Sequence, residues 1–255
     1  MKIINSFFIA FAMYSKIPMP RADWEKENMK YVMCFFPWVG AVIGAVFAAW
    51  GIWGRLLPMG STLHTVILLL LPVLITGGIH LDGLLDTADA LSSYQPKERR
   101  LEILKDSHAG AFAVITCVGY FFLYYGFLSE LSVEFLPVTA MGFFLSRALS
   151  GYAVTAFPCA KNSGLAATFS ESAQKKWAGR SLLVQAILCG GLMILLNPVA
   201  GAAAAAAALL CFGYYYHMSK KQFGGITGDL AGWFLQICEL CMLMAVVLVQ
   251  TVEKL

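Results

Sequence analysis

The sequence is poor in charge. Asp, Glu, Lys and Arg together make up 13% of the 255 residues, whereas hydrophobic residues make up 59%. A soluble domain carries about 25% charged residues, so this composition excludes a water-covered surface. The formal net charge of +3 is too small to indicate binding to nucleic acid. We therefore expect one membrane domain over 1–255, with the lipid bilayer as its surroundings.

Paired cysteine motifs are scarce as well. Seven cysteines are scattered through apolar runs, and the C-x-x-C spacing occurs once, at Cys238 and Cys241, inside an expected spanning helix. Without a second pair, we expect reduced, buried thiols and neither disulfides nor a zinc site. The first fourteen residues are apolar but lack an A-x-A cleavage site, so they predict an interfacial helix rather than a signal peptide.

Long apolar runs are abundant and divide the chain into about seven expected spans. Each is roughly 17–25 residues long, the length that crosses a bilayer core. The runs lie at 32–54, 62–81, 110–129, 135–157, 181–196, 198–217 and 230–250. The sequence thus predicts an all-α, polytopic integral membrane helix bundle, preceded by the interfacial helix.

Basic residues are unevenly distributed between the connecting segments. With the N-terminus inside, nearly all lysines and arginines fall on the cytoplasmic side, while Arg55 and Lys254 fall outside and Arg147 lies within a span. This asymmetry predicts a multi-pass protein of the cytoplasmic (inner) membrane. It also places several polar segments that are far apart in the sequence on one cytoplasmic face.

Three carboxylates follow the second expected span. Asp82, Asp86 and Asp89 are spaced by four and three residues, which places them on one face of a helix. No Lys or Arg occurs between Ile79 and Tyr94, so these like charges repel unless a cation binds between them. A few hard oxygen ligands favour Mg²⁺, which keeps waters and shares phosphate oxygens. The alternative is a solvated helix end with incidental acids.

Polar residues near the third span are further candidates. His80 precedes the acids and is a candidate base, a hydrogen-bond donor or an interfacial side chain. Lys105 is a candidate phosphate contact and Asp106 a further carboxylate, although Lys105 also fits ordinary positive-inside charge.

The later half of the chain supplies the remaining candidates. Arg147 lies near the middle of the fourth span and needs a partner, either Glu239 or a bound phosphate. Asn162 lies in a polar loop at 158–180 that is either substrate-facing or a plain connector. Glycines with a hydroxyl and a carboxylate form the segment at 223–229, which predicts a turn facing phosphate or metal.

Together these residues indicate phosphoryl chemistry. Carboxylate-held Mg²⁺ beside cations neutralises charge that develops on a leaving phosphate and orients the displacement. The residues alone therefore predict a membrane transferase that acts on a diphosphate substrate.

Four motifs resemble those of the cobalamin synthase family, the adenosylcobinamide-GDP ribazoletransferases. The segment TGGIHLDGLLDTADAL at 76–91 is similar to the family's GG-x-HLDGLxDTxDxL. YSKIPMP at 14–20, EILKDSHAGAFA at 102–113 and GGITGDLAG at 224–232 are similar to its T-R-x-P-x-P, E-I-M-K-D-S-x-x-G and GG-x-TGD-x-x-G. The four occur in the family's order across almost the whole chain. Two positions depart, because His108 and Lys16 stand where the family commonly has arginine.

The resemblance implies a reaction that joins adenosylcobinamide-GDP to α-ribazole or its 5′-phosphate. Adenosylcobalamin or its 5′-phosphate would form, and GMP would leave. The implied catalytic residues are His80, Asp82 and Asp86. Charge, side of the membrane and motif match make Asp82, Asp86 and Asp89 the expected Mg²⁺ ligands, with Asp106 and Asp229 as further ligands or candidate bases. The expected substrate contacts are Lys105, Arg147, Asn162, Gly225 and Thr227.

Two other classes of membrane protein are alternatives to a ribazoletransferase. A CDP-alcohol phosphotransferase would show D-x2-D-G-x2-A-R-x8-G-x3-D-x3-D, and Asp82-Gly83 is not followed by that pattern. A transporter would carry acids within several spans, whereas Glu239 alone lies well inside one. Homo-oligomerisation is left open.

Overall fold

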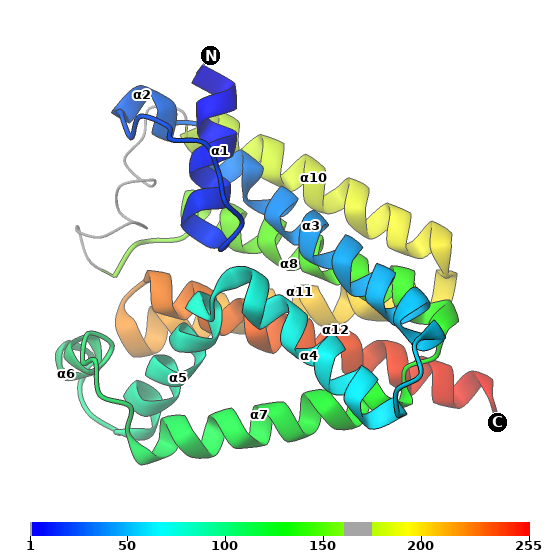
Figure 1. Ribbon diagram of the computed structural model, residues 1–255. Coiled ribbons are helices and arrows are strands. Elements are labelled where there is room, and N and C mark those ends of the chain that lie inside the picture. The colour runs from blue at the N-terminus through cyan, green and yellow to red at the C-terminus, as the bar shows by residue number, and fades with distance from the viewer. Residues whose placement is uncertain (1, 161–174) are drawn as a thin grey trace.

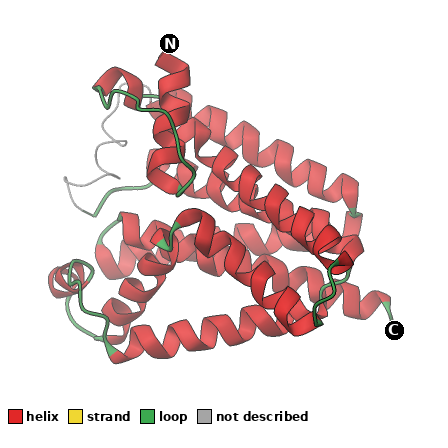
Figure 2. Ribbon diagram, viewed as in Figure 1, coloured by secondary structure: helices red, strands yellow, loops and turns green. Residues whose placement is uncertain are grey.

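The computed structural model describes residues 2–160 and 175–255. Regular structure within these residues is helical, apart from one isolated bridge between Cys159 and Ile226 (Figure 2). The seven cysteines all lie in the described ranges and form no disulfide. The expected all-α fold is confirmed.

Five helices are long and apolar enough to cross a membrane. They are α3 (Val32–Trp53, continued by a 3₁₀ turn, Gly54–Leu56), α7 (Ala111–Glu130), α10 (Lys175–Leu196), α11 (Pro198–Phe223) and α12 (Gly228–Glu253). They correspond to five of the seven predicted spans. Their long apolar sequences provide lipid-facing surfaces and a shared core at once.

A sixth long helix, α8 (Leu136–Ala156), follows a 3₁₀ turn (Val133–Phe135) and lies inside the bundle. It packs against α3, α10, α12 and α11, and most of its residues are buried (Figure 1). It carries several serines and threonines and the charged Arg147 among its buried residues. A helix enclosed by protein needs no lipid-facing side, so α8 tolerates these polar residues. The predicted span 135–157 is a helix, but a central one.

The second predicted span, 62–81, is wrong in its extent. The helix α4 (Ser61–Thr76) ends at Thr76, and α5 (Ile79–Ser92) leaves it at a bend of 92°. Gly77 and Gly78 form the bend with φ values of +67° and +80°, a left-handed conformation that favours glycine. Sixteen residues extend only about 24 Å, less than the ~30 Å bilayer core. Because α5 turns away and carries three aspartates, we do not count it as membrane-spanning.

Short helices surround one end of the bundle, at the left in Figure 1. They are α1 (Lys2–Tyr14), α2 (Lys26–Met29) and α6 (Lys97–Ile103). The expected interfacial helix α1 packs on α3, burying Ile9 and Phe11 and leaving Ile4 exposed. Arg100 of α6 donates a hydrogen bond to Gln222 of α11. The ends of α8 and α11 and the starts of α7 and α12 meet at this same end, beside α5.

Candidate functional site

The site is built where α5 crosses α12 with their backbones in contact. A Cβ at Gly83 would lie 2.5 Å from the carbonyl oxygen of Asp229, and one at Gly232 would lie 3.1 Å from that of His80. Only glycine permits such close approach without displacing a helix. Two motifs that are about 150 residues apart in the chain, HLDG and TGDLAG, therefore form one structure.

Four carboxylates gather at this crossing. Asp82 is exposed, whereas Asp86, Asp89 and Asp229 are partly buried. Partial burial, together with the charges of Asp82, Asp229 and Asp89, raises the pKa of Asp86 to about 6. The predicted convergence of Asp229 with the α5 acids is therefore present in the structure.

The donor set fits a hard divalent cation, although it is not a preassembled cage. The crossing offers carboxylate oxygens, which are the donors that Mg²⁺ prefers, and it offers no thiolate. Among the described residues, no three Asp, Glu, His or Cys side chains are arranged to share one ion. Mg²⁺ commonly binds to one or two carboxylates and to substrate phosphates. Asp82, Asp86 and Asp229 are the residues that would hold it.

Asp89 has another partner. Its two carboxylate oxygens accept hydrogen bonds from the backbone N–H of Gly110, at 2.5 Å, and of Ala113, at 2.8 Å. These N–H groups belong to the start of α7, where a carboxylate is favoured by unpaired donors and by the helix dipole. Asp89 thus joins α5 to α7, and its predicted metal role competes with this capping role.

Lys105 and Asp106 lie on the exposed loop between α6 and α7. Asp106 accepts hydrogen bonds at Oδ1 from the His108 backbone, at 3.0 Å, and from His108 Nδ1, at 2.7 Å. These bonds lower the pKa of Asp106. Since its carboxylate holds its own loop, the structure does not bring Asp106 into the cluster around Asp86. Lys105 remains exposed on the same loop.

A cavity of about 180 Å³ lies beside the α5–α12 crossing. We call it the α5–α12 cavity. Its lining comes from five helices and includes Tyr14 (α1), Met33 and Phe36 (α3), His80 and Asp82 (α5), Ser150 and Val154 (α8), and Asp229 and Leu235 (α12), with Thr227 just before α12. The predicted residues His80, Asp82, Thr227 and Asp229 therefore share one cavity.

His80 is held in this cavity as a neutral side chain. It is only 4% exposed, and its Nε2 has no hydrogen-bond partner. Burial, and secondarily the charge of Arg147, lowers the His80 pKa well below its usual value. Its ring stacks on Tyr14, with centroids 6.3 Å apart, and meets the edge of Phe36 at 5.9 Å.

The sequence prediction did not select Tyr14, Lys16 or Ser150. Tyr14 and Lys16 belong to the YSKIPMP motif, whose similarity to the family's motif predicts no site role for either residue. The Lys16 backbone N–H donates to the Ile75 carbonyl at 2.7 Å, and its side chain packs against Gly77, so this motif closes the α4–α5 bend. Ser150 lies in α8 and belongs to none of the four motifs. Its position in the cavity follows from the packing of α8 and is not visible in the sequence.

The glycine-rich turn before α12 is largely structural. The Thr227 hydroxyl caps α12 by accepting from the Leu230 N–H at 3.2 Å, and it donates to Asp229 Oδ2 at 3.4 Å. Gly225 packs directly on the carbonyl of Pro158, where a Cβ would overlap it. The predicted substrate contact Asn162 lies outside the described residues.

Arg147 is fully buried and paired. Its Nη1 donates to Glu239 Oε1 at 2.6 Å and to the Phe143 carbonyl at 2.9 Å. The Ser146 hydroxyl donates to the same Glu239 oxygen at 2.9 Å. A phosphate would have to displace Glu239 to reach this guanidinium. The geometry therefore favours the Glu239 partner over the predicted phosphate contact.

Fold and site together define a polytopic helical membrane protein with an oxygen-rich acidic site beside a small aromatic cavity, at one end of its bundle. Its sequence matches the family model for cobalamin-5-phosphate synthase over residues 6–247. The chain belongs to this family, which confirms the resemblance drawn from the four motifs.

Curated relatives agree along nearly their whole length. A protein of Lachnoclostridium phytofermentans is 48% identical over 252 residues, covering 99% of this chain and 97% of the relative. Proteins of Clostridium botulinum (strain Eklund 17B) and Desulfitobacterium hafniense are each 33% identical, covering 93% and 96% of this chain and 95% and 97% of the relatives. All three are named adenosylcobinamide-GDP ribazoletransferase. No solved structure matches the chain.

Proposed function

We propose that this protein is an adenosylcobinamide-GDP ribazoletransferase. It joins adenosylcobinamide-GDP to α-ribazole or α-ribazole 5′-phosphate, forms adenosylcobalamin or its 5′-phosphate, and releases GMP. The family membership and the names of the full-length relatives support this reaction. The observation that carries it in this chain is the contact between α5 and α12, which gathers carboxylates around Asp86.

The chemistry required is displacement at phosphorus. A ribose hydroxyl of the ribazole forms a bond to the phosphate that carries the corrinoid arm, and the bond from that phosphate to GMP breaks. Bound Mg²⁺ would supply charge neutralisation for the diphosphate and for the departing GMP. Asp82, Asp86 and Asp229 would hold this ion together with the substrate phosphates, since the three acids lie at the α5–α12 crossing and their charges act on one another.

The attacking hydroxyl must lose a proton. His80 is neutral and lines the same cavity as Asp82 and Asp229, so it can accept that proton next to the acidic cluster. Lys105, exposed on the neighbouring loop, is the cation proposed to contact substrate phosphate.

The proposed location is the cytoplasmic membrane, with the site on the cytoplasmic face. The helix α6, which contains Arg99 and Arg100, lies at the end of the bundle where α5 is found (Figure 1). Lys105 follows α6 in the chain, and Lys220 and Lys221 belong to the last turn of α11, which contacts α6. A concentration of lysine and arginine marks the cytoplasmic side of a membrane protein.

Replacement of Asp86 tests the proposed site. Asp86→Asn keeps the size of the side chain but removes its charge, so Mg²⁺-dependent GMP release by purified protein in lipid nanodiscs should fall by at least 100-fold. The matched control is Glu134→Gln, an exposed acid at the opposite end of the bundle, which should retain wild-type activity. If Asp86→Asn protein keeps wild-type activity and wild-type Mg²⁺ dependence, Asp86 is not part of the site.

A further inference from the structure

Two buried polar groups in the α5–α12 cavity have no partner within the chain. Ser150 is 1% exposed and His80 is 4% exposed, and neither Ser150 Oγ nor His80 Nε2 makes a hydrogen bond. Buried polar groups are normally satisfied, and leaving one unpaired costs about 1–3 kcal/mol. Both residues line the same cavity, so a molecule bound there lies beside both of them.

The rest of the lining is aromatic and aliphatic. The rings of Tyr14 and Phe36 contact the imidazole of His80, and Met33, Val154 and Leu235 complete the apolar part of the wall. A volume of about 180 Å³ is below the size of an ordinary drug-sized site, so the cavity accepts a flat two-ring group but not a corrin macrocycle. Aromatic walls favour a planar ring system.

Asp82 and Asp229 line the same cavity and belong to the acidic cluster. A ring system in the cavity would therefore have its attached sugar next to the carboxylates. This is the arrangement that a nucleoside needs when one of its ribose hydroxyls attacks phosphorus.

We propose that the α5–α12 cavity is the binding site for the benzimidazole base of the ribazole substrate. This inference rests on the proposed function. In a benzimidazole nucleoside one ring nitrogen carries the sugar and the other is an acceptor, to which the Ser150 hydroxyl can donate. Guanine, the other base in the reaction, has polar atoms along most of its edge and would leave several of them unpaired against Met33, Val154 and Leu235.

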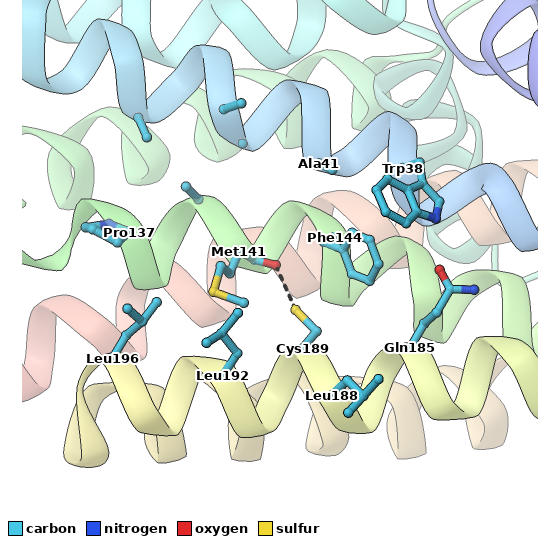
Figure 3. A pocket seen from close by; sticks show the side chains of 14 residues that line it. Trp38, Ala41, Pro137, Met141, Phe144, Gln185, Leu188, Cys189, Leu192 and Leu196 are labelled. Atoms are coloured by element: carbon cyan, nitrogen blue, oxygen red, sulfur yellow. Dashed lines mark hydrogen bonds between the residues drawn. The ribbon is translucent and has the colours of Figure 1, made fainter.

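A larger cavity, of about 570 Å³, lies between α3, α8 and α10 and provides the control (Figure 3). Its lining is mainly apolar, with Trp38, Met141, Phe144 and Leu192 among its side chains, and it contains no acidic residue. Cys189 Sγ donates to the Met141 carbonyl at 3.5 Å within it. It therefore lacks the charged groups that a reacting nucleoside requires.

Two substitutions test the inference. Val154→Phe fills the α5–α12 cavity and should raise the KM for α-ribazole phosphate at least tenfold, while the KM for adenosylcobinamide-GDP stays within twofold. Ser150→Ala, a smaller change, should raise the same KM about three- to tenfold, the effect of one lost hydrogen bond. Met141→Phe adds a ring on the same helix but in the larger cavity, and should leave both KM values unchanged.

Equilibrium dialysis of α-ribazole against the protein in nanodiscs gives a readout that does not depend on turnover. Wild-type protein should bind α-ribazole, and Val154→Phe should weaken this binding at least tenfold, even if no GMP is released and the proposed function fails. The inference is overturned if both variants bind α-ribazole as the wild type does. It is also overturned if only the KM for adenosylcobinamide-GDP rises, since the cavity would then belong to that substrate.

Discussion

At the scale of single residues, the structure separates acids that the sequence shows as equivalent. Asp82, Asp86 and Asp89 follow one helical spacing, yet Asp89 uses both of its oxygens to accept from α7. The spacing predicts a shared face correctly, because it follows from helix geometry. It cannot show that a backbone 21 residues further along will take one carboxylate, since that depends on where α7 begins.

Asp89→Asn tests this separation. The amide keeps one acceptor oxygen and loses the charge at the start of α7, which should lower the melting temperature and reduce kcat severalfold. The Mg²⁺ concentration that gives half-maximal GMP release should stay within twofold of the wild-type value. A tenfold rise in that concentration would instead identify Asp89 as a metal ligand.

The Arg147–Glu239 pair leads to a second residue-scale prediction. Arg147→Met leaves a buried carboxylate without its partner and should destabilise the protein by about 3–5 kcal/mol. The double variant Arg147→Met/Glu239→Leu should recover most of the thermal stability and keep GMP release. Loss of GMP release in a stable double variant would show that Arg147 contacts the substrate.

At the scale of elements, the α5–α12 crossing determines the site. Gly83→Ala places a methyl group 2.5 Å from the Asp229 carbonyl, so the helices must separate, at a cost of about 1–3 kcal/mol. GMP release should fall more than tenfold because Asp229 moves away from Asp86. Gly119→Ala in α7 is the control, since no atom lies within 4 Å of its Cβ position. Equal activity of the two variants would contradict a role for this contact.

The elements also show which features of the fold a sequence can reveal. Hydropathy correctly predicts five of the seven expected spans, because long apolar helices are needed wherever lipid is the solvent. It extends the predicted span 62–81 too far, because α4 ends at Thr76 and Gly77–Gly78 redirect the chain by 92°. It also cannot show that α8 is central, since that depends on which helices surround it. The YSKIPMP motif marks the family, but its contact with the bend appears only in three dimensions.

At the scale of the whole molecule, polar residues from distant segments gather at one end of the bundle. His80, Asp82, Thr227 and Asp229 were predicted from separate motifs, and they line one cavity. In the described part of the bundle, the buried acid Glu239 is engaged by Arg147 and Ser146. This arrangement provides no relay of free acids through the membrane, so it favours an enzyme with a site at one face over a transporter.

The most direct test of this account is ribazole-dependent GMP release by purified wild-type protein in nanodiscs. With adenosylcobinamide-GDP and α-ribazole phosphate, we expect one GMP for each corrinoid product, no release when either substrate is omitted, and loss of release in EDTA that added Mg²⁺ restores. Absence of GMP from the complete mixture would contradict the proposed reaction. Release that continues unchanged in EDTA would contradict the metal-assisted site at the α5–α12 crossing.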